Sequence, residues 1–232
     1  MSISPSTVFL LLACLTVFLQ DPKAEQLDAK GIWTQGQTVL LFTKVHPCTE
    51  ESEIPSAQIL VSTNEGRSWT QRGPREEGGD FEFLYESKGQ VWIAGFHTAE
   101  LGADPFILVP TSLFNWNRYT IHEGPSFLER IAFQKSGHLI ARVRYINFWD
   151  ENWKEYFHKS IDGGRSWSLV GLAPTCVREP GMAFKRIGRT TPTWRIVDAN
   201  DGGFAVQHRG REHGSWRTVS RFPSAPCPGD RR

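Results

Sequence analysis

Short apolar segments alternate with polar or glycine-containing turns along most of this chain, and this pattern predicts strands. Four segments read as two strands joined by a turn, because β-branched and aromatic residues stand on both sides of that turn. These segments are GIWT-QGQ-TVLLFTKV, FEFLYES-KGQ-VWIAGFH, LERIAFQ-KSG-HLIARVRYI and MAFKRI-GRTTP-TWRIVDA. No helical period of 3.6 residues competes with them, so we predict an all-β fold.

Two eight-residue stretches repeat the pattern S-x-D/N-x-G-x-S-W. In such a turn, the Asp or Asn side chain accepts hydrogen bonds from neighbouring backbone N–H groups. The Gly adopts a backbone conformation that a side chain would resist, and the Trp buries apolar surface over the turn. The residues that carry the pattern are Ser62, Asn64, Gly66 and Trp69 in the first stretch, and Ser160, Asp162, Gly164 and Trp167 in the second.

This pattern resembles the Asp-box of the sialidase-like β-propeller family. The resemblance implies four-stranded blades, with strands A to D in chain order and the boxes at the C–D turns. The two boxes lie 98 residues apart, which is about twice the length of one blade. Trp69, Trp116, Trp167 and Trp216 follow the same period, at intervals of 47, 51 and 49 residues. We therefore predict a β-propeller of about four four-stranded blades, at roughly 27–75, 79–124, 127–171 and 181–222.

The predicted blades fill a single domain, residues 25–223, and residues 224–232 read as a C-terminal tail. Three arrangements are compatible with four blades: a closed four-bladed ring, an open partial ring, or half of a larger ring completed by a second chain. The compact four-bladed ring is the favoured arrangement.

The N-terminal segment, residues 1–24, contains an apolar run from Val8 to Leu19 that has the length of a signal-peptide core. No Lys or Arg precedes the run, so an uncleaved anchor and lipidation at Cys14 remain alternatives. The expectation is export to a secreted or periplasmic location, with no membrane span in the mature chain.

Charge and cysteine content narrow the function classes further. The formal net charge is +1, without a basic stripe, so nucleic acid is not an expected partner. Three cysteines follow the N-terminal segment: Cys48, Cys176 and Cys227. A Cys48–Cys227 disulfide would join the last blade to the first. A Cys176–Cys227 bridge and fully reduced thiols are the alternatives. Cys and His spacing does not fit zinc, and no phosphate-binding Gly loop follows a strand, so neither a metal nor a cofactor is predicted.

Candidate ligand-binding residues lie in the loops on the face opposite the boxes. The loop from Asn147 to Trp153 places large aromatic residues beside acids and amides, a composition that suits the C–H faces and hydroxyls of a sugar. The alternative is that its Trp side chains cap a neighbouring blade. The candidate residues are Trp149, Asp150, Glu151, Trp153, Asp198 and Asp201; Asp80 is among the further acids of this face.

The leading functional hypothesis is an exported, non-enzymatic propeller that binds a glycan or a protein partner through this loop face. One alternative is a glycoside hydrolase with a divergent active site. Family resemblance implies three Arg, a Tyr–Glu pair and an Asp for sialidase chemistry, but the family's Arg-Ile-Pro signature is absent here. The second alternative is an assembly or scaffold factor, because fold alone does not decide function.

Overall fold

The computed structural model describes residues 25–48, 54–99, 102–146, 152–173 and 181–224. Within these ranges the chain forms strands, turns and extended connections, which confirms the all-β prediction. These ranges contain no helix that is long and apolar enough to cross a membrane.

The strands form four antiparallel sheets, which we call sheets I to IV. Sheet I contains β1 (Glu25–Gln35), β2 (Thr38–Pro47), β3 (Ser56–Ser62) and β4 (Thr70–Glu77). Sheet II contains β5 (Gly79–Ser87), β6 (Gln90–Ala99), β7 (Gly102–Ser112) and β8 (Asn115–Thr120), with β14 (Lys185–Arg186) beside β5. Sheet III contains β9 (Ser126–Phe133), β10 (Leu139–Ile146), β11 (Trp153–Ser160) and β12 (Ser168–Leu172), with β13 (Met182–Ala183) beside β9. Sheet IV contains β15 (Trp194–Asp198), β16 (Phe204–His208) and β17 (Arg217–Phe222).

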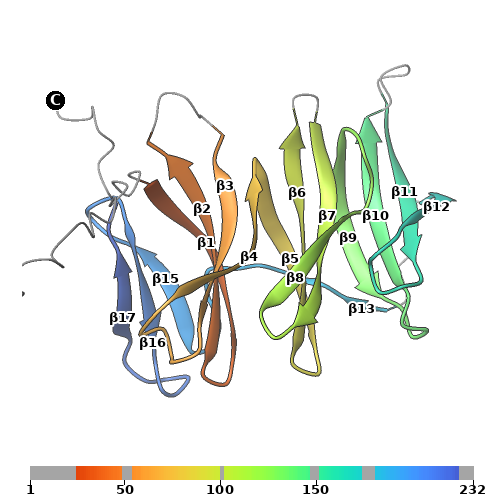
Figure 1. Cartoon of the computed structure of the whole chain (residues 1–232). Helices are drawn as coiled ribbons and strands as arrows, with labels where there is room; N and C mark the ends of the chain where they lie inside the picture. The colour runs from red at the N-terminus through yellow and green to blue at the C-terminus, as the bar shows by residue number, and fades with distance from the viewer. Residues whose placement is uncertain (1–24, 49–53, 100–101, 147–151, 174–180, 225–232) are drawn as a thin grey trace, which may run out of the picture.

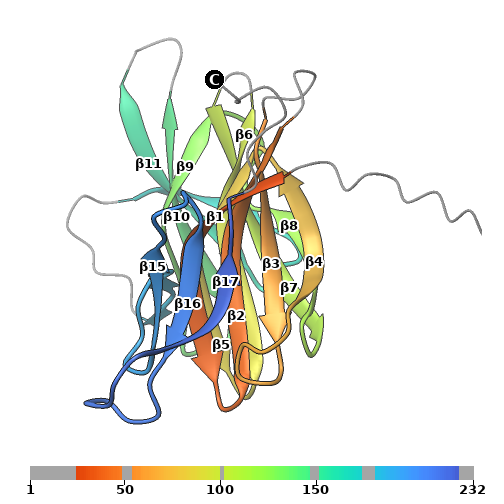
Figure 2. The same ribbon diagram turned by 90° about the vertical axis from the view of Figure 1, so that its left-hand side faces the viewer.

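The four sheets stand side by side in the order IV, I, II, III (Figure 1). Viewed from the sheet IV end, β16 and β17 lie in front of β1 and β2 (Figure 2). The central strands β2 and β3 of sheet I are buried on both faces, because sheet I packs against sheet IV on one side and sheet II on the other. Three apolar cores result. Phe42 and Phe106 are fully buried between sheets I and II, Leu139 and Ile107 between II and III, and Leu41 and Val206 between I and IV.

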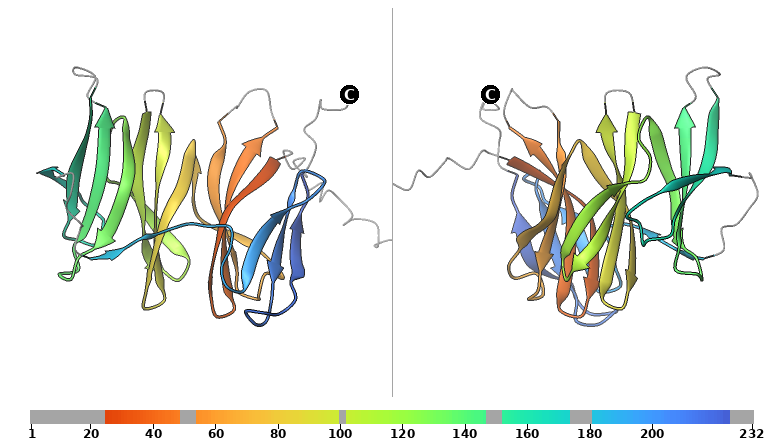
Figure 3. Two further views of the ribbon diagram at one scale, coloured as in Figure 1. Left: turned by 180° about the vertical axis from the view of Figure 1, so that it is seen from behind. Right: turned by 45° about the vertical axis from the view of Figure 1, so that its right-hand side comes forward.

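One segment, residues 181–190, crosses three sheets on its way from sheet III to sheet IV (Figure 3, left). We call it the crossing segment. Phe184 N donates to Ile131 O of β9 at 3.0 Å, and Ile187 N donates to Glu82 O of β5 at 2.8 Å. Ile32 N of β1 then donates to Gly188 O at 2.9 Å. The crossing segment thereby supplies partners to the edges of three first strands, whose backbone groups would otherwise lack them.

Two sequence-based expectations need correction here. Residues 182–187 were expected to be the first strand of the fourth blade, but they pair with sheets III and II, and sheet IV has three strands. The favoured compact ring is also not seen: sheets III and IV lie at opposite ends of the row, and no apolar core joins them among the described residues. Their outward faces carry polar pairs, such as Arg142 with Glu155 and Arg195 with Gln207, in place of an apolar layer.

The two repeated turns have the same local hydrogen-bond pattern. Asp162 Oδ1 accepts from Ser160 Oγ at 2.7 Å and from Ser166 N at 2.9 Å, and Gly164 N donates to Ser160 Oγ at 2.7 Å. In the first stretch, Asn64 Oδ1 accepts from Ser62 Oγ and Ser68 N, each at 2.9 Å. Gly164 has a φ of +101°, which favours glycine there.

The tryptophans of the period take different positions at the sheet interfaces. Trp69 packs between sheets I and IV and donates from Nε1 to Ser220 Oγ at 2.9 Å. Trp116 is buried between sheets I and II, and Trp167 packs between II and III. Trp216 lies under the guanidinium groups of Arg195 and Arg209. The spacing of Trp69, Trp116 and Trp167 therefore reflects packing between neighbouring sheets, whereas Trp216 is not part of these apolar cores.

Cys48, which follows β2, is disulfide-bonded. Its expected partner Cys227 and the alternative Cys176 lie outside the described residues. The Cys48–Cys227 pairing stays a prediction.

Candidate functional site

The residues expected to bind a ligand do not form one cluster. Trp149, Asp150 and Glu151 lie outside the described residues. Trp153 begins β11 in sheet III, whereas Asp198 ends β15 in sheet IV, at the other end of the row (Figure 1).

Asp198 and Asp201 lie beside hollows at sheet IV. A hollow of about 290 Å³ between sheets I and IV is lined by Asp28, His46 and Asp198, among others. A second, of about 340 Å³, is lined by both Asp198 and Asp201. Asp201 Oδ1 accepts from Gly203 N at 3.1 Å, so it shapes its own turn. Asp198 thus lines both hollows, one with Asp28 and the other with Asp201.

The first strands of sheets I, II and III share a feature that the sequence analysis missed. Each of β1, β5 and β9 contains a β-bulge, and the extra residues are Lys30, Glu82 and Glu129. A bulge turns a side chain out of the regular alternation, and bulges are frequent beside active sites. Because these strands also pair with the crossing segment, they form one continuous edge, which we call the first-strand edge.

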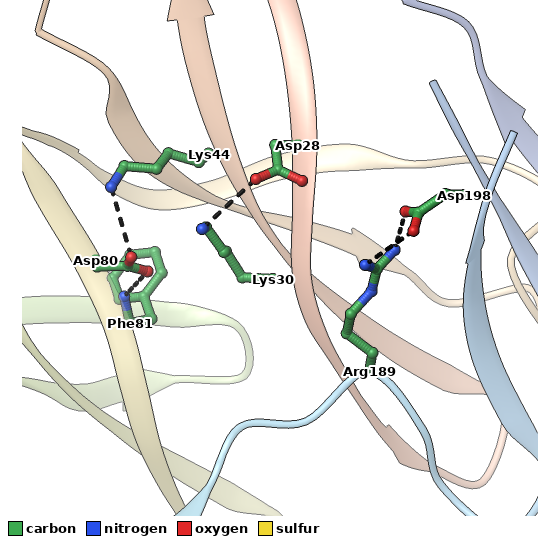
Figure 4. A network of polar contacts seen from close by, with 7 residues as sticks. All are labelled: Asp28, Lys30, Lys44, Asp80, Phe81, Arg189 and Asp198. Carbon is green, nitrogen blue, oxygen red and sulfur yellow. Dashed lines mark hydrogen bonds and ion pairs between the residues drawn. The ribbon is translucent and has the colours of Figure 1, made fainter. Parts of the chain in front are cut away.

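Carboxylates and cations follow one another along the first-strand edge (Figure 4). Asp28 Oδ2 lies 3.5 Å from Lys30 Nζ, and Asp80 Oδ2 lies 3.5 Å from Lys44 Nζ, which links sheets I and II. Asp80 also accepts from Phe81 N at 2.9 Å. These contacts hold Asp80 in place at the start of β5.

The crossing segment adds cations to this edge. Arg189 donates to both carboxylate oxygens of Asp198, and this pairing holds the pKa of Asp198 below its ordinary value of 3.8. Three residues earlier, the guanidinium group of Arg186 lies 5.3 Å from the centre of the Phe83 ring and interacts with the charge of Glu82. The edge therefore carries both signs of charge.

Glu82 has the electrostatics of a general acid. Its pKa is raised above the ordinary 4.5, first because burial disfavours the charged carboxylate. Arg186 partly opposes this rise, while the negative charges of Asp80 and Glu129 add to it. Glu129 in turn lies 2.8 Å from Arg144 Nε. The edge thus combines one carboxyl group of raised pKa with carboxylates that face cations.

Sequence reasoning found some of these residues and missed others. Asp80 and Asp198 were recognised as acids of the loop face. Glu82 and Glu129 were missed, because both occupy polar positions within strands that alternate as solvent-facing strands do. One sequence feature could have pointed to these residues: successive first strands carry a charged residue at equivalent positions, namely Lys30, Glu82 and Glu129.

A second titratable cluster lies between sheets II and III. Tyr145 Oη and His158 Nε2 share a hydrogen bond, and the ring centres of His122 and Tyr145 lie 4.1 Å apart with the rings tilted by 57°. Burial, followed by the charge of His122, lowers the pKa of His158 to about 4. The described residues contain no group of three His, Cys, Asp or Glu side chains that could hold a metal ion. This cluster presents aromatic rings, of which His158 is buried and His122 and Tyr145 are half-buried, whereas the first-strand edge presents paired carboxylates.

Comparison with known proteins identifies similarity at the level of structure. No protein-family model matches the sequence, and no curated protein matches it. One similar structure is a Penicillium chrysogenum α-L-arabinanase complexed with arabinobiose, with a TM-score of 0.40 and 14% identity over 86% of this chain and 76% of that chain. A GH93 α-L-arabinofuranosidase of Fusarium graminearum gives 0.40 and 13% over 87% and 66%. Zg3597, a family 117 glycoside hydrolase of Zobellia galactanivorans, gives 0.39 and 11% over 88% and 72%.

These comparisons correct the leading functional hypothesis. The non-enzymatic reading is contradicted, because the structures described above are glycoside hydrolases, which was the alternative reading. The fold is a propeller-like all-β fold, with antiparallel sheets side by side and their first strands along one edge. At these TM-scores the likeness assigns no residue role, so the chemistry has to be argued from the carboxylates of this chain.

Proposed function

We propose that this protein is a glycoside hydrolase whose active centre is the first-strand edge. Glycoside hydrolysis generally uses two carboxyl groups: one donates a proton to the leaving oxygen, and the other acts as base or nucleophile. Glu82 is the proton donor in this proposal. Asp80 and Glu129 are the candidates for the ionised partner.

The observation that carries the proposal is the raised pKa of Glu82 between two other carboxylates. A carboxyl group of raised pKa keeps its proton to a higher pH and can protonate a glycosidic oxygen, and a nearby carboxylate can then stabilise positive charge on the sugar ring. Lys44 faces Asp80 and Arg144 faces Glu129, at 3.5 and 2.8 Å respectively. The paired cation holds each carboxylate in place for the second role.

The crossing segment has a defined part in this mechanism. Its Ile187 N–H is hydrogen-bonded to Glu82 O, so it fixes the backbone of the bulge that directs the Glu82 side chain. Arg186 lies close enough to Glu82 to oppose the rise of its pKa. The segment thus holds the acid in position and limits how strongly its pKa is raised.

The finer predictions on architecture are part of the same proposal. The four sheets are blades of an open, sialidase-like propeller domain spanning residues 25–223. Residues 1–24 act as a signal peptide that directs export of the chain, and Cys48 pairs with Cys227 in the exported protein. The disulfide-bonded state of Cys48 supports an oxidising location.

The ligand is a glycan, and the arabinobiose named with one similar structure makes arabinan oligosaccharides the first substrates to assay.

Hydrolysis assays with defined variants test the proposal. The purified chain is incubated with arabinan and other neutral and acidic oligosaccharides, and released reducing ends are measured. Glu82→Gln should lower kcat by about 100-fold or more, because general acid catalysis contributes that much. Glu86→Gln, on the exposed end of the same strand, is the matched control and should retain full activity.

Two results would contradict this proposal. One is the absence of hydrolysis across the substrate set. The other is a Glu82→Gln variant with wild-type kcat on a substrate that the chain hydrolyses. Separate Asp80→Asn and Glu129→Gln variants assign the ionised partner, since the variant of that residue should lose activity to a similar degree.

A further inference from the structure

Sheet III has an outward face, turned away from sheet II, that carries exposed aromatic side chains. Phe127 on β9 lies directly opposite Arg144 on β10, and Trp153 on β11 lies opposite Ile146. Phe127 is 38% exposed and Trp153 is 45% exposed. The other Phe, Trp and Tyr side chains among the described residues are buried or half-buried. Exposed aromatic residues that cluster on one face often mark a binding surface.

Arg144 joins the two rings into one surface. The ring centres of Phe127 and Trp153 are 5.4 Å apart, and the Arg144 guanidinium carbon lies 5.6 and 4.8 Å from them. Its Nε lies 2.8 Å from Glu129 Oε1. We call Phe127, Arg144 and Trp153 the aromatic platform. Its cation–π contacts and its ion pair restrict the side chains before any ligand binds, which lowers the entropic cost of binding.

The chemistry of the platform fits a sugar ring without a charge. An aromatic face packs against the apolar C–H face of a sugar, while guanidinium N–H groups donate to hydroxyls and carboxylate oxygens accept from them. Two arginines of this face are paired with carboxylates, Arg144 with Glu129 and Arg142 with Glu155. Arg130 and Lys159 lie on the same face, opposite Arg142 and Ile140 of β10. A carboxylated sugar would gain little from the two arginines whose charge already faces a glutamate.

The platform is continuous with the first-strand edge through Glu129. This residue is the bulge residue of β9, and its carboxylate faces Arg144 on one side. Its charge also acts on Glu82 of sheet II. A glycan that reaches from Glu82 to Trp153 would pass Glu129.

We infer that the aromatic platform is a binding subsite for a neutral sugar unit of an oligosaccharide whose scissile bond lies at Glu82. This inference rests on the proposed function. It specifies the substrate class as neutral oligosaccharides of several units, because a single sugar at Glu82 would leave the platform empty.

Binding to an array of neutral and carboxylated oligosaccharides tests the inference. The Glu82→Gln chain is used, so that the bound glycan is not cleaved. Neutral oligosaccharides should bind about threefold more tightly than carboxylated ones, which is the size of one exposed like-charge contact. Adding Trp153→Ala should weaken binding about tenfold, whereas Trp153→Tyr should restore most of it. Leu169→Ala, another exposed apolar side chain of sheet III, is the matched control.

Wild-type kinetics provide a second readout. With a substrate of several units, Trp153→Ala should raise KM about tenfold and leave kcat unchanged, and with a single-sugar aryl glycoside it should change neither. If hydrolysis of long substrates proceeds with an unchanged KM in Trp153→Ala, the subsite is wrong and the proposed reaction stands. If no substrate is hydrolysed but array binding depends on Trp153, the reaction is wrong and the platform is supported as a sugar site.

Three further results would overturn the inference. One is array binding that is indifferent to Trp153→Ala in a variant that melts at the wild-type temperature. Another is tighter binding of carboxylated glycans. The third is a dimer in sedimentation experiments that Trp153→Ala dissociates, which would assign this face to a second copy of the chain.

Discussion

At the scale of single residues, the proposed active centre depends on bulges that the amino-acid pattern does not reveal. Lys30, Glu82 and Glu129 each occupy a polar position in a strand with otherwise regular alternation, so sequence alone places them in solvent. The register shift depends on pairing with the next strand, which is a non-local property. Asp198 could be predicted, because an acid in a loop after a strand is visible in the sequence.

The repeated turns are the residue-scale feature that the sequence predicts best, and Asp162 tests it. Its carboxylate accepts from Ser160 Oγ, Arg165 N and Ser166 N. Burial of Asp162 opposes ionisation, but the hydrogen bonds from Ser166, Ser160 and Arg165 together outweigh it and lower its pKa. Asp162→Ala should therefore reduce the free energy of unfolding by about 1–2 kcal/mol. Urea denaturation with an unchanged m-value would measure this loss.

The first turn provides the control for this prediction. Asn64 occupies the equivalent position and accepts from Ser62 Oγ and Ser68 N with one amide oxygen. Asp162→Asn should therefore reduce the free energy of unfolding by at most half as much as Asp162→Ala does. Equal destabilisation by Asn and Ala would contradict the role assigned to the accepting oxygen.

At the scale of elements, the crossing segment distinguishes this fold from the arrangement expected for residues 181–222. The sequence correctly predicts extended structure for MAFKRI, but an extended segment can pair with any exposed edge. Here it pairs with β9 and β5, and Gly188 continues to β1. Local propensity therefore predicts the conformation of the segment, whereas its partners depend on the whole chain.

A close approach between β1 and the crossing segment makes this element testable. A Cβ atom at Gly31 would lie 2.2 Å from Ile187 Cγ2 and 3.0 Å from Gly188 O. Gly31→Ala should therefore displace the segment and reduce the free energy of unfolding by about 1–3 kcal/mol, the usual cost of overpacking. Thermal and urea unfolding measure the loss.

Two companion variants isolate the cause. Gly188→Ala places its Cβ in open space and should leave stability close to that of the wild type. Gly31→Ala combined with Ile187→Ala removes the closest clash and should destabilise less than the sum of the single changes. Strict additivity would show that the segment does not press against Gly31.

At the scale of the whole molecule, the sequence predicts the repeat but not its closure. The tryptophan period identifies repeated sheets, because Trp69, Trp116 and Trp167 each pack at an interface between neighbours. Closure depends on whether the outward faces of sheets III and IV are apolar. Each face instead carries a polar pair between neighbouring strands, Arg142 with Glu155 and Arg195 with Gln207. The open row also separates Trp153 from Asp198, which a closed ring would bring closer together.

The row arrangement places the proposed chemistry on the edge where three sheets meet the crossing segment (Figure 3, left). Glu82 in sheet II lies in the middle of this edge, with sheet I on one side and sheet III on the other. The central claim is therefore that hydrolysis requires the Glu82 carboxyl group in its protonated form.

The most direct test is the pH dependence of kcat/KM for the best substrate. Because burial raises the pKa of Glu82, its carboxyl group keeps its proton above pH 4.5, and activity should fall as the pH rises through that pKa. The Glu82→Gln variant should lose this descending limb together with most of the activity. A descending limb that persists unchanged in Glu82→Gln would contradict the account.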